Sequence, residues 1–596
     1  MRIYFEGHRY NADQIEPYLD GLNLLDIDTK NNKRWTDRIG YLFVSKEIYS
    51  GPIFILPKSF LISEKGKEDL VLGMDGIYPE DVIDTDDPQN PFEETGESTF
   101  LPELSLWLYR ALNRFREENE GTTIAQTANL DAQLPDNDTR DNDFLSTALD
   151  LIDFLKDHRN LFTQISLINH SGRNKIDWPK TVAGDPFFND GEPWYLEPEI
   201  KDKVINIDDT LIILYYSVLK YLRDKYKFPI NLGEVPYTLL TTDEVQNLID
   251  TGVGSKQMQR IRHQYFRDDL KHLWTLLDSF FTYNTSDDDK DKREEHLLVS
   301  DFQIVFEAMI DRLISDTHGV EDLKKQDDGK LIDHIFKFKS LIDNRSDIYY
   351  IGDSKYYKSG EKTRPEGVAL YKQFTYAKNT IQYHIDTLYL KHGQLPGSTE
   401  RKVSLRYRDT LTEGYNITPN FFMRSRVTPS DIPYDKPDIG MTYWDKSKQR
   451  EYPETNKHFE DRLFDRDTLI LREFSISLLF VIAAYAGYEE SCWASDIHTT
   501  IRKSFIESID KEYEFYKLTP LNVTTVEFDR IYTKWLNGKT YAIDDLDESL
   551  ILAFEKNARG RADKEAFEKQ RFTKTETGEE IRYDLSPTTL QQLSQR

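Results

Sequence analysis

An aspartate and a lysine two residues apart follow an apolar run in the second half of the chain. Asp353 and Lys355 come directly after residues 348–351 (IYYI), a run typical of a buried β-strand. Residues i and i+2 of a strand point to the same face, so the carboxylate and the ammonium would share one face. A carboxylate can hold Mg²⁺ while an ammonium polarises an attacking water, and the backbone carbonyl of Ser354 can complete the metal shell. The pattern therefore predicts metal-assisted hydrolysis.

The Asp-x-Lys spacing is weak by itself. Residues 28–30 (DTK) and 269–271 (DLK) repeat it in a chain in which 31% of the residues are charged. The strand context separates the pair at 353 and 355 from these copies, because a charge on a buried strand is costly unless it is paired or has a task.

A β-hairpin is expected to position the pair. Residues 331–342 alternate like a strand, residues 343–347 supply turn residues, and residues 348–357 form the returning strand. This hairpin would bring Asp333 beside Asp353 as a second metal ligand. The alternative is that Asp333 is a solvated residue at the start of a strand.

Helices are expected on both sides of the hairpin, in the order helix, strand, strand, helix. An amphipathic helix over residues 297–315 carries Glu307, which is either a third carboxylate for the metal or an ordinary exposed helix residue. A second helix spans residues 366–390. Residues 355–408 hold eleven basic and four acidic residues, a net charge of +7. Such a segment suits a phosphate-binding wall, although a solvated basic surface has the same composition.

Periodicity along the rest of the chain predicts a multidomain α+β protein. The expected regions are a β-rich module at 1–100, a mostly helical middle at 101–290 with a mobile acidic linker at 122–143, an α/β domain at 291–557 and a frayed, charged polar tail at 558–596. In the first region we expect a hairpin that turns at 50–52 (SGP). Further helices are expected at 101–118, 144–156, 210–227 and 256–283, and a strand followed by a buried helix at 469–488.

Composition limits the classes of function. The net charge is -28, which argues against a chain that coats nucleic acid unaided. The single cysteine, Cys492, allows no internal disulfide and no cysteine-based zinc site, which favours a cytoplasmic protein. The longest apolar run, residues 477–487, is far shorter than the roughly 20 residues needed to cross a bilayer, so no membrane association is expected.

Residues 350–357 (YIGDSKYY) resemble the LlaJI-type restriction endonucleases and the McrC subunit of McrBC systems. Residues 40–44 (GYLFV), 54–61 (FILPKSFL) and 104–117 (LSLWLYRALNRFRE) resemble the LlaJI-type family as well. The set of Asp333, Asp353 and Lys355, with Glu307 before it and Gln373 after it, looks like a PD-(D/E)xK nuclease core.

The resemblance implies an Mg²⁺- or Mn²⁺-dependent endonuclease that cleaves double-stranded DNA in a restriction or phage-defence system. It also implies a partner, an McrB-like AAA+ GTPase that recognises and translocates DNA, with the N-terminal β-rich region docked on the partner ring. Gln373 would lie near the metal-bound water or the DNA backbone. This chain has no complete GxxxxGK[ST] motif, so GTP would be bound by the partner.

Two residues depart from the family pattern. Ile332 stands before Asp333 where many relatives have proline, and Tyr376 follows Gln373 by three residues instead of four, with Ala377 in the fourth place. The role of Tyr376 is therefore open.

The alternative function is a non-catalytic adaptor that activates an AAA+ motor and carries a vestigial nuclease core. One active site cuts one strand, so double-strand cleavage implies two copies of the nuclease or two encounters.

Overall fold

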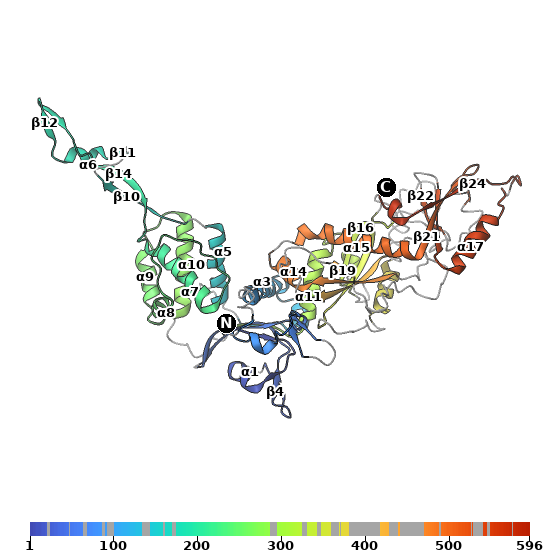
Figure 1. Cartoon of the computed structure of the whole chain (residues 1–596), viewed down its shortest axis with the longest axis horizontal. Helices are drawn as coiled ribbons and strands as arrows, with labels where there is room; N and C mark the ends of the chain where they lie inside the picture. The colour runs from blue at the N-terminus through green and yellow to red at the C-terminus, as the bar shows by residue number, and fades with distance from the viewer. Residues whose placement is uncertain are drawn as a thin grey trace.

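The computed structural model shows an elongated molecule of several packed units (Figure 1). It describes the chain apart from residues 21–23, 47, 64–67, 86, 88–89, 92–99, 134–142, 159–160, 170–174, 286–294, 325–330, 342–346, 359–368, 370, 381–417, 428–438, 442–469, 488–489, 526, 529–539, 545–548, 575 and 596. The described residues form helical and mixed-sheet units in succession, which confirms the predicted multidomain α+β fold. None of the described helices is long and apolar enough to span a membrane.

The N-terminal module is built on a five-stranded sheet in which strands from distant parts of the sequence meet. Its order is β1-β6-β5-β15-β9, with β1 parallel to β6 and the other neighbours antiparallel. The strands are β1 (Arg2–Phe5), β5 (Ile39–Lys46), β6 (Tyr49–Leu56), β9 (Asp131–Gln133) and β15 (Glu295–Val299). Around it lie β2 (Tyr10–Asn11), α1 (Ala12–Leu19), β3 (Asp26–Asp28), β4 (Lys33–Trp35), η1 (Lys58–Phe60), β7 (Leu61–Ile62), β8 (Leu70–Val71) and η2 (Pro79–Val82).

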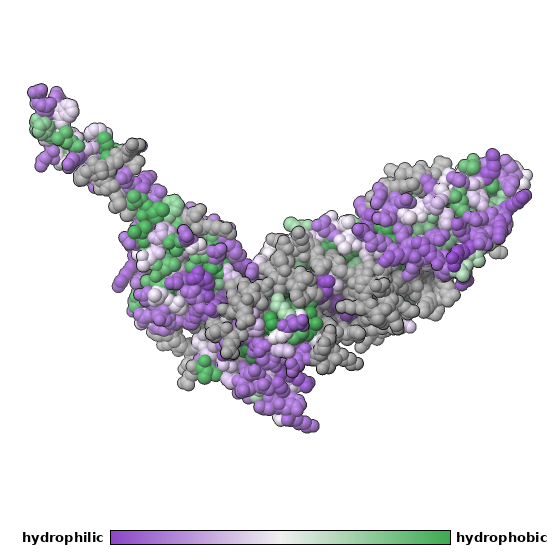
Figure 2. Space-filling model, in the orientation of Figure 1, coloured by the Kyte–Doolittle hydropathy of each residue, from purple (hydrophilic) through white to green (hydrophobic). Residues whose placement is uncertain are grey.

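In the helical middle region, five of the described helices pack into a bundle, from which a thin β-arm projects (Figure 1). The bundle consists of α5 (Phe144–Asp157), α7 (Thr210–Tyr226), α8 (Thr242–Asp250), α9 (Val253–Ile261) and α10 (Asp268–Thr285). Before it in the sequence come α3 (Phe100–Asn119), which packs against the N-terminal sheet, and α4 (Thr123–Thr127), which packs against α3. The arm contains β10 (Gln164–Asn169), β11 (Lys175–Ile176), α6 (Trp178–Ala183), β12 (Phe187–Asn189), β13 (Glu192–Trp194) and β14 (Ile200–Ile205). Hydrophobic residues are exposed along the arm, as Figure 2 shows, among them Phe187, Phe188 and Trp194.

The sheet that carries the candidate site has the order β16-β17-β18-β20-β19. Strands β17, β18 and β20 are parallel, and β16 and β19 are antiparallel to their neighbours. Its elements are α11 (Phe302–Ile314), α12 (Glu321–Lys324), β16 (His334–Lys339), β17 (Asp347–Lys355), β18 (Asn420–Arg426), β19 (Ile439–Met441), β20 (Leu471–Ser477), α14 (Leu478–Ala486) and α15 (Glu490–Glu512), with residues 371–380 helical as well. The last unit consists of β21 (Tyr513–Pro520), β22 (Thr540–Asp544), β23 (Ser549–Glu555), α17 (Ala558–Lys569), β24 (Tyr583–Thr588) and α18 (Leu590–Leu593).

One large hydrophobic core joins the N-terminal module, the helical region and one face of the site sheet. Helix α3 is central to it, because α3 packs against both the N-terminal sheet and α14. Arg114 of α3 donates to the carbonyl of Tyr485 on α14, and the Tyr485 hydroxyl donates to Glu118 at 2.7 Å. The N-terminal module and the site sheet are therefore packed together through shared buried side chains.

Several sequence predictions hold with small shifts. The helix predicted at 101–118 is α3, the one at 144–156 is α5, and the one at 210–227 is α7. The strand and buried helix predicted at 469–488 are β20 and α14.

The hairpin of the first region turns earlier than predicted. Lys46 pairs with Tyr49, so Gly51 and Pro52 lie within β6 and do not form the turn. Proline lacks a backbone N–H, but the pairing of β6 with β1 begins only at Ile53, so no hydrogen bond to β1 is lost at Pro52.

Two helix predictions were too long. Residues 297–299 belong to strand β15, which inserts between β5 and β9, and α11 begins only at Phe302. Residues 256–283 form two helices, α9 and α10, which fold back on each other so that the Trp274 indole donates to the Met258 carbonyl at 2.8 Å.

The predicted linker and tail are partly or largely folded. Residues 122–143 begin with α4 and β9, and residues 134–142 lie outside the described part of the chain. The prediction of a frayed tail from residue 558 is wrong. Strand β24 pairs with β21, and Phe567 and Phe572 enter a small core with β21 and β23. The charged composition hid these few well-spaced aromatic residues.

Candidate active site

Asp333 and Asp353 lie opposite each other at the open end of the β16–β17 hairpin. The register pairs His334 with Gly352, and Asp333 is the residue just before β16. Asp353 is buried, with 7% of its surface exposed, and Asp333 is half-buried. The charge of Asp353 acts on Asp333 and, after burial, is the largest cause of the raised pKa of Asp333. The predicted hairpin thus brings these two acids together.

Glu307 and Lys355 complete a cluster of three carboxylates and one ammonium. Glu307 is half-buried on α11 and accepts a hydrogen bond from Gln303 at 2.8 Å. Lys355 forms an ion pair with Asp353 on the same face of β17. Both Glu307 and Lys355 interact electrostatically with Asp353, and Asp333 interacts with all three. The acids in this cluster therefore outnumber its lysine.

The excess of acids is visible in the pKa shifts. Burial, followed by the charges of Asp353 and Glu307, raises the pKa of Asp333 well above its ordinary value. Burial also raises the pKa of Glu307, and the charge of Asp353 adds to that rise. Burial lowers the pKa of Lys355, but the Asp353 and Asp333 carboxylates outweigh burial, so the net shift is upward. A cation added to this cluster would relieve the repulsion between its acids.

The donor chemistry of the cluster fits a hard divalent cation. Carboxylate oxygens are the ligands that Mg²⁺ prefers, and Mg²⁺ is often held by one or two carboxylates with several waters. The described part of the chain contains no group of three or more His, Cys, Asp or Glu side chains in metal-holding geometry. In the described residues the cluster would therefore hold such a cation with fewer than three of its side chains, and water would fill the remaining positions.

Gln373 is buried and its side-chain amide is unsatisfied. It lies in the helical residues 371–380, is 0% exposed, and neither polar atom of its amide has a hydrogen-bond partner among the described residues. On the same helix, Tyr376 packs against Ile335 and Ile351, and Ala377 packs against Phe422. The helix therefore covers the face of the sheet that carries Asp353. Tyr376, whose role the sequence left open, is a packing residue there.

Two residues on this face, Arg424 and Glu473, were missed in the sequence. The register aligns Asp353 with Phe422 and Glu473 across three strands, and Lys355 with Arg424 in the next row on the same face. The Nε atom of Arg424 lies 2.9 Å from Oε1 of Glu473, and both side chains are largely buried. Burial raises the pKa of Glu473 to about 7, against the opposing charge of Arg424. A charge inside each apolar strand was the available signal, as it was at Asp353.

A second missed group lies on the opposite face of β17. Ser354 points away from Asp353, as the alternation of a strand requires, and its hydroxyl lies 2.6 Å from Nε2 of the fully buried His334. The Nδ1 atom of His334 lies 3.5 Å from Asp311 on α11. Burial raises the pKa of Asp311, but His334 and Lys324 outweigh burial and lower it. This chain of contacts fixes β16 and β17 against α11.

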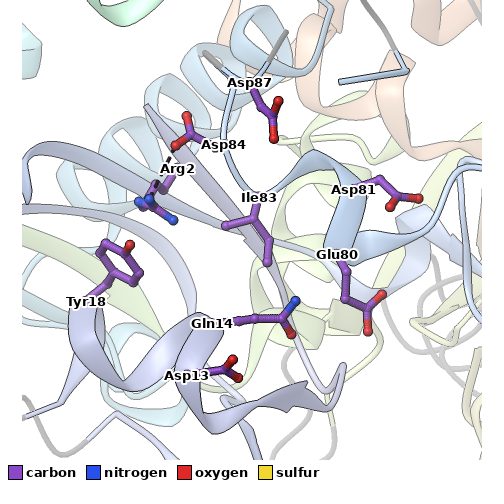
Figure 3. A pocket seen from close by; sticks show the side chains of 9 residues that line it. All are labelled: Arg2, Asp13, Gln14, Tyr18, Glu80, Asp81, Ile83, Asp84 and Asp87. Carbon is purple, nitrogen blue, oxygen red and sulfur yellow. Dashed lines mark hydrogen bonds and ion pairs between the residues drawn. The ribbon is translucent and has the colours of Figure 1, made fainter. Parts of the chain in front are cut away.

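The pocket drawn in Figure 3 lies in the N-terminal module, between β1, α1 and η2, apart from the carboxylates of β17. It has a volume of about 400 Å³. Arg2 lies over the Tyr18 ring at 3.6 Å and pairs with Asp84 at 3.3 Å. The acidic residues of the lining are Asp13, Glu80, Asp81, Asp84 and Asp87. An acidic lining disfavours phosphate, so this pocket is no candidate for the DNA backbone.

Most of the basic segment predicted at 355–408 lies outside the described residues. Within them, Lys355 ends β17 and Lys358 lies three residues further on, and Lys372 and Lys378 lie on the helix that carries Gln373. The predicted phosphate-binding wall stays a prediction.

Comparisons with known proteins add little. No protein-family model matches the chain, and no curated protein matches its sequence. Among solved structures, the chain is similar to one in the refined half-complex from the tetradecameric assembly of Thermococcus gammatolerans McrB AAA+ hexamers with bound McrC. The identity is 11% and the TM-score 0.26, over 82% of this chain and 98% of that chain. At that TM-score the likeness does not establish a shared fold, and no functional argument follows from it.

Proposed function

We propose that this chain is the Mg²⁺- or Mn²⁺-dependent DNA endonuclease subunit of a restriction or phage-defence system. The observation that carries the proposal is the convergence of Glu307, Asp333 and Asp353 on the ammonium of Lys355, where burial and the charge of Asp353 raise the pKa values of Glu307 and Asp333. Such an excess of buried acid is costly unless the site binds a cation. Helix α11, the hairpin and the helix carrying Gln373, arranged around a mixed sheet, support a core of the PD-(D/E)xK type.

Each residue has a role that follows from its surroundings. Asp333 and Asp353 would hold the metal with the Ser354 carbonyl, and Glu307 would bind through water. The bound metal would supply charge neutralisation at the phosphate and a more acidic water. Lys355 stays protonated because Asp353 and Asp333 raise its pKa, so it can donate a hydrogen bond to a water or a phosphate oxygen. The buried amide of Gln373 can orient the same water.

The proposal includes double-stranded DNA as substrate and an McrB-like AAA+ GTPase as partner. The net charge of -28 supports a division of labour in which another subunit provides most of the grip on DNA. The partner is inferred from the family resemblance of residues 350–357. We propose the N-terminal module as its docking surface, a pair of nuclease copies for double-strand cleavage, and the cytoplasm as its location.

The alternative is a non-catalytic adaptor that stimulates an AAA+ motor. One observation favours it: in the described ranges, no three His, Cys, Asp or Glu side chains are arranged to chelate a metal. A vestigial nuclease core would look like this if its ligand geometry had been lost.

Cleavage of plasmid DNA separates the two functions. Asp353→Ala and Lys355→Ala should lose Mg²⁺-dependent cleavage while their folding is retained. Asp347→Ala is the matched control, because Asp347 lies on the same strand in an exposed ion pair with Lys339. Undiminished cleavage by both site variants rejects the nuclease proposal. Stimulation of the partner's NTPase activity by a wild-type chain that cleaves under no metal condition supports the adaptor.

A further inference from the structure

The three residues that follow Lys355 are each held by a different residue of the N-terminal module. The Tyr356 hydroxyl donates to Oε2 of Glu6 at 2.5 Å. The backbone carbonyl of Tyr357 accepts from the Ser59 hydroxyl at 3.0 Å. The Lys358 ammonium pairs with Asp69. The corresponding partners lie beyond the end of β1, in η1 and just before β8.

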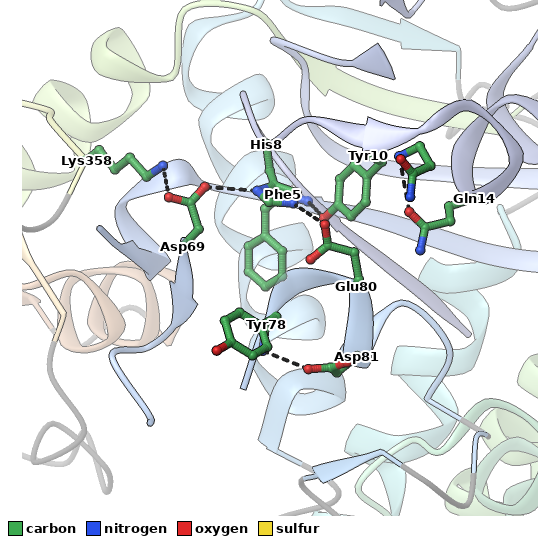
Figure 4. A network of polar contacts seen from close by, with 10 residues as sticks. Phe5, His8, Tyr10, Gln14, Asp69, Tyr78, Glu80, Asp81 and Lys358 are labelled. Atoms are coloured by element: carbon green, nitrogen blue, oxygen red, sulfur yellow. Dashed lines mark hydrogen bonds and ion pairs between the residues drawn. The ribbon is translucent and has the colours of Figure 1, made fainter. Parts of the chain in front are cut away.

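Behind Lys358 runs a row of alternating charges, shown in Figure 4. Asp69 accepts from Lys358 and lies 2.9 Å from Nδ1 of His8, whose Nε2 lies 3.1 Å from Glu80. The His8, Asp69 and Lys358 side chains are each less than a fifth exposed. With His8 protonated, the row carries two positive and two negative charges and is neutral. Asp69 is therefore fixed from both sides.

Strand β17 needs this support where its catalytic residues lie. The antiparallel pairing with β16 ends at Gly352, whereas the pairing with β18 continues through Lys355. Asp353 and Lys355 thus have a β-neighbour on one side only, among the described strands. The contacts of Tyr356, Tyr357 and Lys358 anchor the chain directly after that half-paired stretch.

We propose that Glu6 and Asp69 of the N-terminal module, with His8 holding Asp69, are positioning residues that fix Lys355 through the three residues that follow it. The inference rests on the proposed function, because it assigns Lys355 to catalysis. A misplacement of about 1 Å can cost on the order of 100-fold in rate, so such an anchor has a direct effect on turnover.

The row of charges also gives the anchor a pH dependence. Burial lowers the pKa of His8, but its hydrogen bonds to Asp69 and Glu80 outweigh burial and raise it. The protonated form is therefore favoured at low pH, and the support of Asp69 weakens as pH rises through the raised His8 pKa. The charged or titratable groups that face His8 are its two partners, Asp69 and Glu80, and Tyr10. Lys358 and Lys33 face these partners in turn.

The test uses the full chain and compares Asp69→Asn, Lys358→Gln and Lys358→Arg with wild type. Hydrogen–deuterium exchange of residues 353–358 should become about tenfold faster in the first two variants and stay near wild type in Lys358→Arg, which keeps the charge. The Mg²⁺-dependent kcat on plasmid DNA should fall on the order of 10- to 100-fold at unchanged KM. Asp347→Asn removes one partner of an exposed ion pair at the other end of β17, so it should change neither the exchange of residues 353–358 nor kcat.

The outcomes separate the two proposals. Wild-type exchange and kcat in Asp69→Asn and Lys358→Gln would overturn the positioning role. An equal fall in kcat for Lys358→Arg and Lys358→Gln would also overturn it, because charge would then not matter. If Asp69→Asn fails to fold, the comparison of Lys358→Gln with Lys358→Arg decides alone whether the positioning role holds. If wild type cleaves no DNA, the nuclease proposal fails, and the exchange data still decide whether the module holds β17.

Discussion

Two clusters of acidic residues in this molecule have the same residue types and opposite pKa shifts. In the N-terminal module, burial raises the pKa of Asp69, but His8 and Lys358 outweigh burial and lower it. The hydrogen bond from His8 likewise lowers the pKa of Glu80. At the end of β17, burial and neighbouring carboxylates raise the pKa values of Asp333 and Glu307.

The difference lies in the number of cations. The two acids of the first cluster lie beside two cationic groups, protonated His8 and Lys358. The three acids of the second cluster share the ammonium of Lys355, and His334 also opposes the rise in the pKa of Glu307. Paired acids stabilise the folded chain and need no ligand. Acids that raise each other's pKa destabilise it until a cation arrives, which is a common arrangement at functional sites. We therefore interpret the first cluster as an anchor and the second as a metal site.

The largest effect is expected for Asp333→Asn. Cleavage should fall on the order of 10²- to 10⁴-fold, because the substitution removes a carboxylate from the proposed metal site. Without divalent metal at pH 8, the same variant should be more stable than wild type by about 1 kcal/mol, since it relieves repulsion with Asp353 and Glu307. Thermal unfolding and plasmid cleavage measure the two effects.

A loss of stability in Asp333→Asn would break the comparison, because it would show that Asp333 is a paired structural acid. Lys339→Gln, an exposed change on the neighbouring strand, controls for nonspecific effects of altered charge.

Asp69→Asn should lower the unfolding free energy, whereas Asp333→Asn should raise it. It leaves Lys358 and His8 without their shared carboxylate, so the unfolding free energy should fall by about 1 to 2 kcal/mol at pH 7. Asp347→Asn removes one partner of an exposed ion pair and should cost well under about 1 kcal/mol. Equal stability of Asp69→Asn and Asp347→Asn in denaturant titrations would show that the anchor is not a strong one.

The stability differences of Asp333→Asn and Asp69→Asn from wild type should depend on pH in opposite directions. An acid with a raised folded pKa keeps a proton that the unfolded chain has lost, so stability falls as pH rises above the unfolded value of 3.8. The gain from Asp333→Asn should therefore vanish below about pH 4 and grow above it. Asp69 has a lowered pKa, so its contribution is present above 3.8 and is lost as pH falls further.

Chemical unfolding of wild type, Asp333→Asn and Asp69→Asn between pH 3 and pH 8 checks both trends. Parallel curves for the two variants would contradict the assignment of opposite pKa shifts.

The smallest effect is expected for Glu473→Gln. Because burial raises the pKa of Glu473 to about 7, the carboxyl is partly protonated near neutral pH and glutamine resembles its neutral form. The unfolding free energy at pH 6 should change by less than about 1 kcal/mol. Arg424→Gln should cost more, because it leaves a buried carboxyl without its cationic partner. A larger cost for Glu473→Gln than for Arg424→Gln would reverse this account of the pair.

The sequence was sufficient where the signal is local. The apolar run before Asp353 and the turn residues after residue 342 predict the hairpin, and the hairpin alone brings Asp333 to Asp353. It was insufficient where a contact joins distant segments. Nothing near Tyr356 or Lys358 indicates that Glu6 and Asp69 hold them, because sequence separations of about 300 residues leave no periodic pattern.

The same limit explains why Arg424 and Glu473 were missed. Their alignment with Lys355 and Asp353 depends on the parallel register of three strands, which no local pattern determines. Strand β15 was taken for the start of a helix for a similar reason. Its apolar residues suit either structure, and only the pairing with β5 selects the strand.

Binding of Mn²⁺ tests the metal site most directly. The free-ion EPR signal would be followed while wild type, Asp353→Asn and Asp347→Asn are titrated at physiological salt, with Mg²⁺ as competitor. Our account predicts a site that Mg²⁺ empties in wild type and Asp347→Asn, and affinity weaker on the order of 10- to 100-fold in Asp353→Asn. Equal affinity of the three proteins would contradict a metal site at Asp353.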